Sequence, residues 1–156
     1  KLIRNKYIMG YKYGIWLVYD EDIFETKHAG HFTIACFMER LDAVNLYNEL
    51  KSVCGDKATI GINGDPVIFS PGFYEHDDNN LVAWGYEGES KLWQKYAEIC
   101  QKYKCDFSSI PHTSIEYSDI EQNQINTKKT EDTTIYCKMH CVDITSNNPS
   151  EWNIII

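Results

Sequence analysis

Apolar and polar positions alternate in many short stretches of the chain, which is the pattern of strands buried on one face. These stretches are rich in the β-branched and aromatic residues that strands favour. The predicted strands cover residues 13–19, 31–38, 58–62, 67–69, 81–86, 110–117, 133–144 and 151–156. Gly61, Gly64 and Pro66 interrupt the third and fourth of these, so the pattern leaves their ends open.

Two other segments carry apolar residues at helical spacing. The first helix is predicted over 39–54, and Gly55 is in place to end it. Its apolar stripe comprises Ala43, Leu46, Tyr47, Leu50, Val53 and Cys54. The second helix is predicted over 90–103, with Leu92, Trp93, Tyr96, Ile99, Cys100 and Tyr103 on its stripe. The polar segment 118–132 is expected to be a loop.

This order of elements predicts an α+β protein with a single domain over residues 1–156. Each half of the chain has one helix and one strand that bears a histidine. We therefore expect two similar lobes of β-sheet, each with a helix, on either side of a central groove.

Two of the predicted strands repeat a short motif. His31-Phe32-Thr33-Ile34 and His112-Thr113-Ser114-Ile115 each place a histidine two residues before a hydroxyl residue. Residues two apart on a strand project from the same face, so each histidine and its Thr33 or Ser114 point into the same space. One such motif is common, whereas two copies in matching strands predict a pair of imidazoles that face one reacting group.

A pair of imidazoles is suited to acid–base chemistry on a phosphate. Histidine titrates near neutral pH, so one ring can accept a proton while the other donates one. The hydroxyls of Thr33 and Ser114 can donate hydrogen bonds to the nonbridging oxygens. These four candidate catalytic residues need no metal and no cofactor for this reaction.

The charge of the chain bears on the substrate. The chain has 15 basic and 23 acidic residues, a formal net charge of −8, and no basic stripe. Because proteins that grip long nucleic acids present positive surface, we expect a small nucleotide or only the end of a larger molecule. The same excess of acidic residues argues against binding to an anionic membrane surface. No apolar run in the sequence has the length of a membrane span.

The cysteines bear on the cellular compartment. The six are Cys36, Cys54, Cys100, Cys105, Cys137 and Cys141. Several fall on apolar faces, as buried reduced thiols do, and the first residues do not resemble a signal peptide. We expect a cytoplasmic monomer.

The doubled motif resembles that of the two-histidine (2H) phosphoesterase superfamily, which includes LigT-like proteins and cyclic phosphodiesterases. The sequences Tyr13-Gly14-Ile15-Trp16-Leu17, His112-Thr113-Ser114-Ile115-Glu116-Tyr117 and Ser150-Glu151-Trp152 are similar to the first strand, second motif and ending of the cyclic phosphodiesterase branch. The resemblance covers most of the chain.

The resemblance implies a bilobal fold and metal-independent attack on phosphodiesters. Family members act on 2′,3′-cyclic phosphates, RNA ends, 2′–5′ oligoadenylates or cyclic dinucleotides, and some viral members destroy nucleotide messengers of host immunity. This chain is acidic and lacks basic residues beside its motifs, which favours a small nucleotide over a large RNA. The alternatives are an enzyme that acts on RNA ends and a module of the same fold that only sequesters nucleotides.

Six further residues are candidates for substrate binding. Trp84 and Tyr86 share a face and either stack on a base or pack in the core, and Tyr13 is open to the same two interpretations. Glu116 is expected on the face of His112 and Ser114. Lys138 and His140 share a face that either borders the groove or is solvated.

Two other features of the sequence are expected to have no role in the chemistry. Cys137 and Cys141 fall on the strand face opposite His140, and no Cys-x-x-Cys occurs, so we expect no zinc site. His28 and His76 lie in polar connections and are expected to be solvated.

Overall fold

The structure is a computed structural model that describes residues 12–69, 82–118, 120–146 and 148–156. His76 lies outside the described residues. The strands are β1 (Tyr13–Val18), β2 (His31–Met38), β3 (Lys57–Phe69), β4 (Val82–Glu89), β5 (Asp106–Phe107), β6 (His112–Ser118), β7 (Thr133–Asp143) and β8 (Asn153–Ile154). The helices are α2 (Arg40–Cys54), α3 (Trp93–Cys100) and α4 (Gln122–Ile125), with 3₁₀ turns η2 (Asn126–Lys128) and η3 (Pro149–Glu151).

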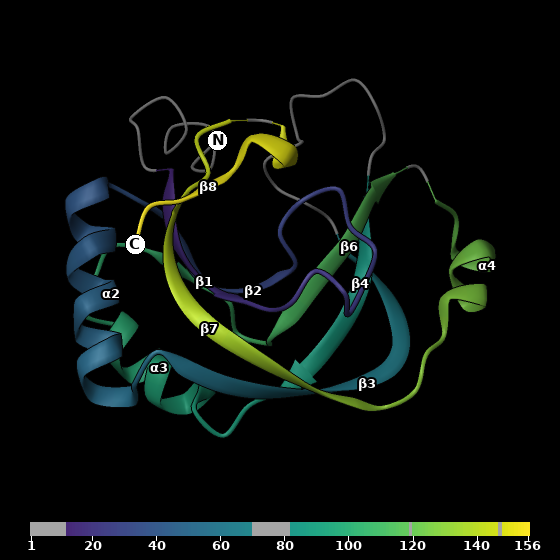
Figure 1. The fold of residues 1–156 in the computed structure, drawn as a ribbon, viewed down its shortest axis with the longest axis horizontal. Helices are drawn as coiled ribbons and strands as arrows, with labels where there is room; N and C mark the ends of the chain where they lie inside the picture. Colours follow the sequence, from purple (N-terminus) through teal and green to yellow (C-terminus); the bar gives the residue numbers. More distant parts are fainter. Residues whose placement is uncertain (1–11, 70–81, 119, 147) are drawn as a thin grey trace.

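All the strands belong to one antiparallel sheet in the order β5-β2-β1-β7-β3-β4-β6, and β8 pairs with β7. The sheet curls into a half-barrel, with α2 and α3 together on one side and α4 on the other (Figure 1). The α+β class is therefore confirmed. The sheet is continuous through β7, and α2 and α3 pack against each other rather than on separate halves.

Strand β7 joins the two halves by a staggered pairing. Its residues Thr133 to Lys138 pair with β3, and its residues Lys138 to Asp143 pair with β1. The motif strands β2 and β6 lie far apart in the strand order but contact each other, because the sheet curls. The curl therefore brings the two halves of the doubled motif together.

Most of the predicted helices and strands are confirmed. The differences lie mainly at their ends, where the sequence pattern is weakest. The predicted strands 58–62 and 67–69 form one strand, β3, with an irregularity between Ile62 and Pro66. Helix α3 is shorter than predicted and starts after Ser90, whose side chain accepts a hydrogen bond from the Leu92 amide. The segment expected to be a loop contains α4 and η2, and the last predicted strand is reduced to β8.

Helix α2 ends as its sequence predicts. Gly55 has a φ of 80°, a conformation that favours glycine, and its amide donates to the Lys51 carbonyl. Ala43, Leu46, Tyr47 and Leu50 are buried as expected. Val53 is instead 53% exposed, so the last turn of the helix extends beyond the core.

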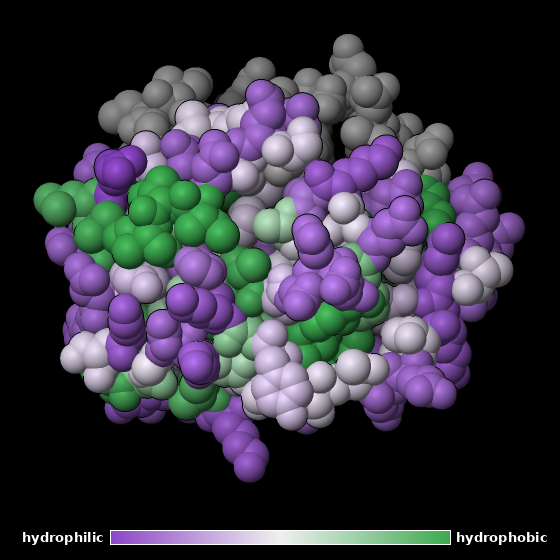
Figure 2. Space-filling view, in the orientation of Figure 1, coloured by the Kyte–Doolittle hydropathy of each residue, from purple (hydrophilic) through white to green (hydrophobic). Residues whose placement is uncertain are grey.

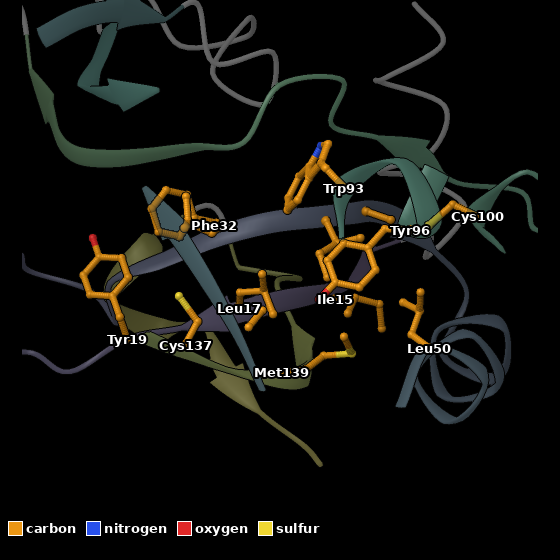
Figure 3. Close-up of a cluster of buried hydrophobic side chains, with 14 of the residues drawn as sticks. Ile15, Leu17, Tyr19, Phe32, Leu50, Trp93, Tyr96, Cys100, Cys137 and Met139 are labelled. Atoms are coloured by element: carbon orange, nitrogen blue, oxygen red, sulfur yellow. The ribbon is translucent and has the colours of Figure 1, made fainter. Parts of the chain in front are cut away.

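One hydrophobic cluster fills the space between the sheet and these helices. Ile15 and Leu17 of β1 pack with Met139 of β7, Leu50 of α2 and Tyr96 of α3 (Figure 3). Among the described residues, no helix is long and apolar enough to cross a membrane. Exposed hydrophobic residues gather over the start of α2 and the C-terminal end, where Leu41, Ile154 and Ile156 are exposed (Figure 2).

Gly85 of β4 lets the second motif strand approach closely. A Cβ atom at this position would lie 1.8 Å from the Thr113 carbonyl oxygen and 3.1 Å from the Ser114 Cα. Gly85 is also the register partner of Ser114. Glycine is therefore required here because the backbone of β6 occupies the space that a side chain would need.

We expect Gly85→Ala to lower the free energy of unfolding by about 1–3 kcal/mol, the usual cost of overpacking a site that cannot relax. Gly61→Ala is the matched control, because a Cβ atom at Gly61 of β3 meets nothing within 4 Å. Urea unfolding of both variants measures the difference. Equal stability of the two variants would contradict the close approach of β4 and β6.

Candidate functional site

The two motif histidines make the same hydrogen bond. The Nδ1 atom of His31 lies 2.7 Å from the Ala29 carbonyl oxygen, and the Nδ1 atom of His112 lies 3.1 Å from the Ile110 carbonyl oxygen. In each case the carbonyl belongs to the residue two positions earlier. Because a carbonyl only accepts, Nδ1 carries the hydrogen and Nε2 is the nitrogen left for proton transfer.

Both motif strands also have the same irregularity. Along β2, Thr33 pairs with Trp16 and Ala35 with Ile15, so one extra residue lies between them. Along β6, Ser114 pairs with Gly85 and Glu116 with Trp84, again with one extra residue between. The extra residues are the isoleucines that end the two motifs, Ile34 and Ile115, and both are buried. Each histidine and its hydroxyl partner therefore precede a bulge, which redirects the side chains that follow.

The His31 ring is buried among aromatic rings. It stacks on the Trp16 indole with centroids 3.5 Å apart and the planes 8° from parallel, and it is only 6% exposed. The Trp152 ring lies at 6.1 Å, edge-on. His112 is less buried, and its ring lies 4.6 Å from the ring of Phe69.

A buried hydrogen bond connects the two halves beside the histidines. The hydroxyls of Tyr19 and Thr113 are 2.7 Å apart. Tyr19 directly follows Val18, the register partner of His31, and Thr113 directly follows His112. Burial raises the pKa of Tyr19 to about 12, so its hydroxyl stays neutral and can share a hydrogen bond with Thr113. This bond positions the two motif strands relative to each other.

Burial also controls the charge of His31. It lowers the pKa of this ring to about 3, and repulsion from His28 and His112 acts in the same direction, while the Ala29 carbonyl opposes it. The electrostatic interaction with His112 is further support for the proximity of the two motif histidines. His31 is therefore neutral at physiological pH, with the lone pair of Nε2 able to accept a proton.

The hydroxyl residues lie where strand alternation predicts. Thr33 is the register partner of Trp16, which stacks on His31, so Thr33 shares the face of that ring. Ser114 is two residues after His112 and precedes the bulge in β6. Both are half-buried. The structure thus places each hydroxyl on the same face as its histidine.

Glu116 lies on the other face, and the expectation for this residue was wrong. The bulge at Ile115 reverses the alternation of side chains along β6. Glu116 pairs with Trp84 and Thr113 pairs with Tyr86. Because Trp84 and Tyr86 share one face of β4, Glu116 lies on the face of Thr113. Its carboxylate accepts a hydrogen bond of 3.2 Å from the Trp84 indole nitrogen. A bulge leaves no clear mark in a sequence, and simple alternation therefore fails at this position.

Trp84 and Tyr86 lie in the core rather than in an open pocket. They are 6% and 4% exposed. The ring of Phe24 stacks on Tyr86 at 5.3 Å, and the Lys128 ammonium group lies 5.7 Å from the Trp84 ring centroid. Of the two interpretations of this pair, the structure favours packing, because the rings already have partners.

Tyr13, Lys138 and His140 come from β1 and β7 rather than from the motif strands, and Lys138 and His140 share the sheet face of His31. Tyr13 packs against the core at the start of β1, with the Arg40 guanidinium 5.7 Å from its ring centroid. His140 pairs with Trp16 and its Nδ1 atom donates to the Ile156 carbonyl at 2.9 Å. Lys138 pairs with Val18, so it shares the sheet face of His31 from two strands away.

Three residues that the sequence did not indicate as site residues lie close to His31. The ring of His28 is 5.5 Å from that of His31 and 5.7 Å from that of Tyr117, and Trp152 lies within 6.3 Å of all three rings. The bulge places Tyr117 on the side where Glu116 was expected. Strand alternation could not have indicated His28, because this residue precedes the predicted strand and lies an odd number of positions before His31.

His28 is packed against His31 rather than solvated. Its Nδ1 atom lies 3.1 Å from the Ala29 carbonyl oxygen, and burial lowers its pKa. Its Nε2 atom is buried and has no hydrogen-bond partner in the part of the chain that the structure describes. A buried polar atom without a partner is unfavourable.

Cys100, Cys137 and Cys141 are buried thiols. Cys137 and Cys141 are buried on the core face of β7, and burial raises their pKa values to about 12 and about 11. Within the described ranges, no three histidine, cysteine or acidic side chains are close enough together to hold a metal ion.

A scan against models of protein families, a search of curated proteins and a search of solved structures each found no match to this chain. The interpretation of the site therefore depends on its residues and their geometry.

The buried neutral state of His31 predicts a pH-dependent stability. The unfolded chain binds a proton at the ordinary pKa of 6.5, whereas the folded chain does so only near 3. Protonation therefore favours unfolding, and stability is lost as the pH falls below 6.5. Between pH 7 and pH 5 we expect this group to lower the free energy of unfolding by about 2 kcal/mol.

The His31→Asn variant keeps a donor for the Ala29 carbonyl but has no titrating group. Urea unfolding at pH 7 and pH 5 should show a smaller loss of stability on acidification for this variant than for the original chain. Equal losses in the two proteins would contradict the buried neutral ring.

Proposed function

We propose that this chain is a metal-independent phosphodiesterase of small nucleotides that uses His31 and His112 in acid–base catalysis. The observation that carries the proposal is the matched pair of hydrogen bonds from Nδ1 to backbone carbonyls, which leaves Nε2 of both rings for proton transfer. The doubled bulge supports it, because the two motifs are then alike in backbone as well as in sequence. The two halves of the sheet correspond, in this proposal, to the two lobes of a 2H phosphoesterase.

The two histidines have different roles in this mechanism. His31 is the base, because its low pKa leaves the ring neutral, and the negative charge of a bound phosphate then raises that pKa and strengthens the base. His112, which is less buried, is the acid. Nε2 of His31 accepts a proton from an attacking water or ribose hydroxyl, whose oxygen forms a bond to phosphorus. The bond from phosphorus to the leaving oxygen breaks, and His112 gives that oxygen a proton.

The neighbouring groups complete the proposed site. Thr33 and Ser114 donate hydrogen bonds to the nonbridging oxygens, which gain charge in the transition state. The rings of Phe69, Tyr117 and Trp152 surround the histidines and favour a substrate that carries nucleobases.

The substrates that fit best are small nucleotides, because the chain has a net charge of −8. Cyclic dinucleotides and 2′–5′ oligoadenylates rank first, and mononucleoside 2′,3′-cyclic phosphates follow. If the chain is viral, the reaction would remove nucleotide messengers in the host cytoplasm.

We expect His31→Ala and His112→Ala each to lower kcat by about 10²–10⁴-fold, the usual contribution of a general acid or base. The assay follows the cleavage of a cyclic dinucleotide, 2′–5′ triadenylate and 2′,3′-cyclic AMP by liquid chromatography in the presence of EDTA. Full activity of either variant would overturn the mechanism. Tight binding of a nucleotide by the original chain without cleavage would favour a sequestering module instead.

The hydroxyl residues give a second prediction. Thr33→Val should lower kcat by about 10²-fold with a smaller change in KM, because the lost donor acts mainly on the charge of the transition state. Thr134→Val is the matched control, since Thr134 is an exposed strand residue of β7 away from the motifs. A similar decrease in kcat for both variants would show that Thr33 has no part in catalysis.

A further inference from the structure

A hollow lies along strands β3 and β7 in the part of the chain that the structure describes. It has a volume of about 660 Å³, within the usual range for small-molecule sites. Its lining comes from β7, β3, the end of β1 and the segment just before α3. Neither His31 nor His112 contributes to the lining, although Val18, the register partner of His31, does. Binding in this hollow can therefore be tested separately from the function proposed above.

The charge of this hollow is opposite to that of the chain. Lys57, Lys91 and Lys138 line it, and among the described residues no aspartate or glutamate does. The chain as a whole has 23 acidic residues and only 15 basic ones. Within the part of the chain that the structure describes, none of these three lysines forms an ion pair. Their positive charge is therefore available to an anion.

Two of the lysines are held side by side by the sheet. Lys57 of β3 and Lys138 of β7 are direct register partners. Like charges at directly opposite positions of an antiparallel pair repel each other and destabilise the sheet. An anion between the two ammonium groups would turn this repulsion into attraction, and a phosphate group has the oxygens to contact both.

An exposed aromatic ring lies next to the lysines. Tyr136 is two residues before Lys138 on β7, so the two side chains project from the same face. Its side chain is 74% exposed, which is unusual for a large aromatic residue. Thr59, its register partner, and Ser90 add hydroxyl groups to the lining. A flat ring beside cations is an arrangement that binds a base and its phosphates together.

We propose that this hollow is a binding site for a nucleoside polyphosphate. The phosphates lie between Lys57 and Lys138, with Lys91 as a third cation, and the base stacks on Tyr136. The segment 90–92 also leads into α3, whose first turn has no acidic residue, so the helix dipole adds positive potential at this edge of the hollow.

Isothermal titration calorimetry with ATP tests the proposal on the intact chain. We expect saturable binding at one site and a decrease in affinity of at least tenfold in the Lys57→Gln/Lys138→Gln variant, because two contacts to charged phosphate oxygens are lost. The matched control is Lys95→Gln/Lys102→Gln, which removes the same charge from exposed lysines that pair with glutamates elsewhere. The control should bind ATP as the original chain does. Thermal unfolding of each variant confirms that it is folded.

Two further measurements define the ligand and the site. Tyr136→Ala should weaken the binding of ATP about tenfold and leave the binding of inorganic pyrophosphate unchanged, because only ATP has a base to stack. The His31→Ala/His112→Ala variant should bind ATP with the affinity of the original chain, even if it has lost phosphodiesterase activity. The proposal is overturned if ATP does not bind. It is also overturned if the Lys57→Gln/Lys138→Gln and Lys95→Gln/Lys102→Gln variants lose the same amount of affinity for ATP. Equal binding of pyrophosphate and ATP, unaffected by Tyr136→Ala, would overturn the assignment of a nucleoside.

Discussion

The staggered pairing of β7 is the constraint on which the rest of the structure depends. One half of this strand pairs with β3 and the other half with β1, and only Lys138 pairs with both. The sheet therefore continues from one half of the chain to the other while it twists and curls. Strands β2 and β6 come close only as a result of this curl (Figure 1). The bond between Tyr19 and Thr113 then fixes their approach.

The two motif strands use the same backbone device to present their side chains. In each, a carbonyl two residues earlier holds the imidazole, and a bulge at the following isoleucine ends the alternation. The isoleucine is buried in both cases and anchors the bulge in the core. The motif is thus a small structural unit that orients one ring and one hydroxyl group, and the chain contains it twice.

Burial distinguishes the two copies. His31 stacks on Trp16 with Trp152 nearby, and the loss of hydration lowers its pKa so far that the ring stays neutral. His112 lies at a more open position beside Phe69. The hollow beside Lys57 and Lys138 differs from the surroundings of His31, because its charged side chains are exposed to water. The same sheet face therefore carries a buried neutral ring and, farther along, a group of exposed cations.

Local patterns in the sequence determined the elements, the α+β class and the pairing of His31 with Thr33 and of His112 with Ser114, because alternation and helical spacing are properties of neighbouring residues. They failed where the backbone departs from regular geometry, as at Ile115, where a bulge exchanges the faces of Glu116 and Tyr117. They could not show that Trp84 and Tyr86 are covered by Phe24 and Lys128, since these partners are distant in the chain. The single curled sheet, the packing of His28 against His31 and the low pKa of His31 also depend on contacts between distant segments, and only the tertiary structure decided them.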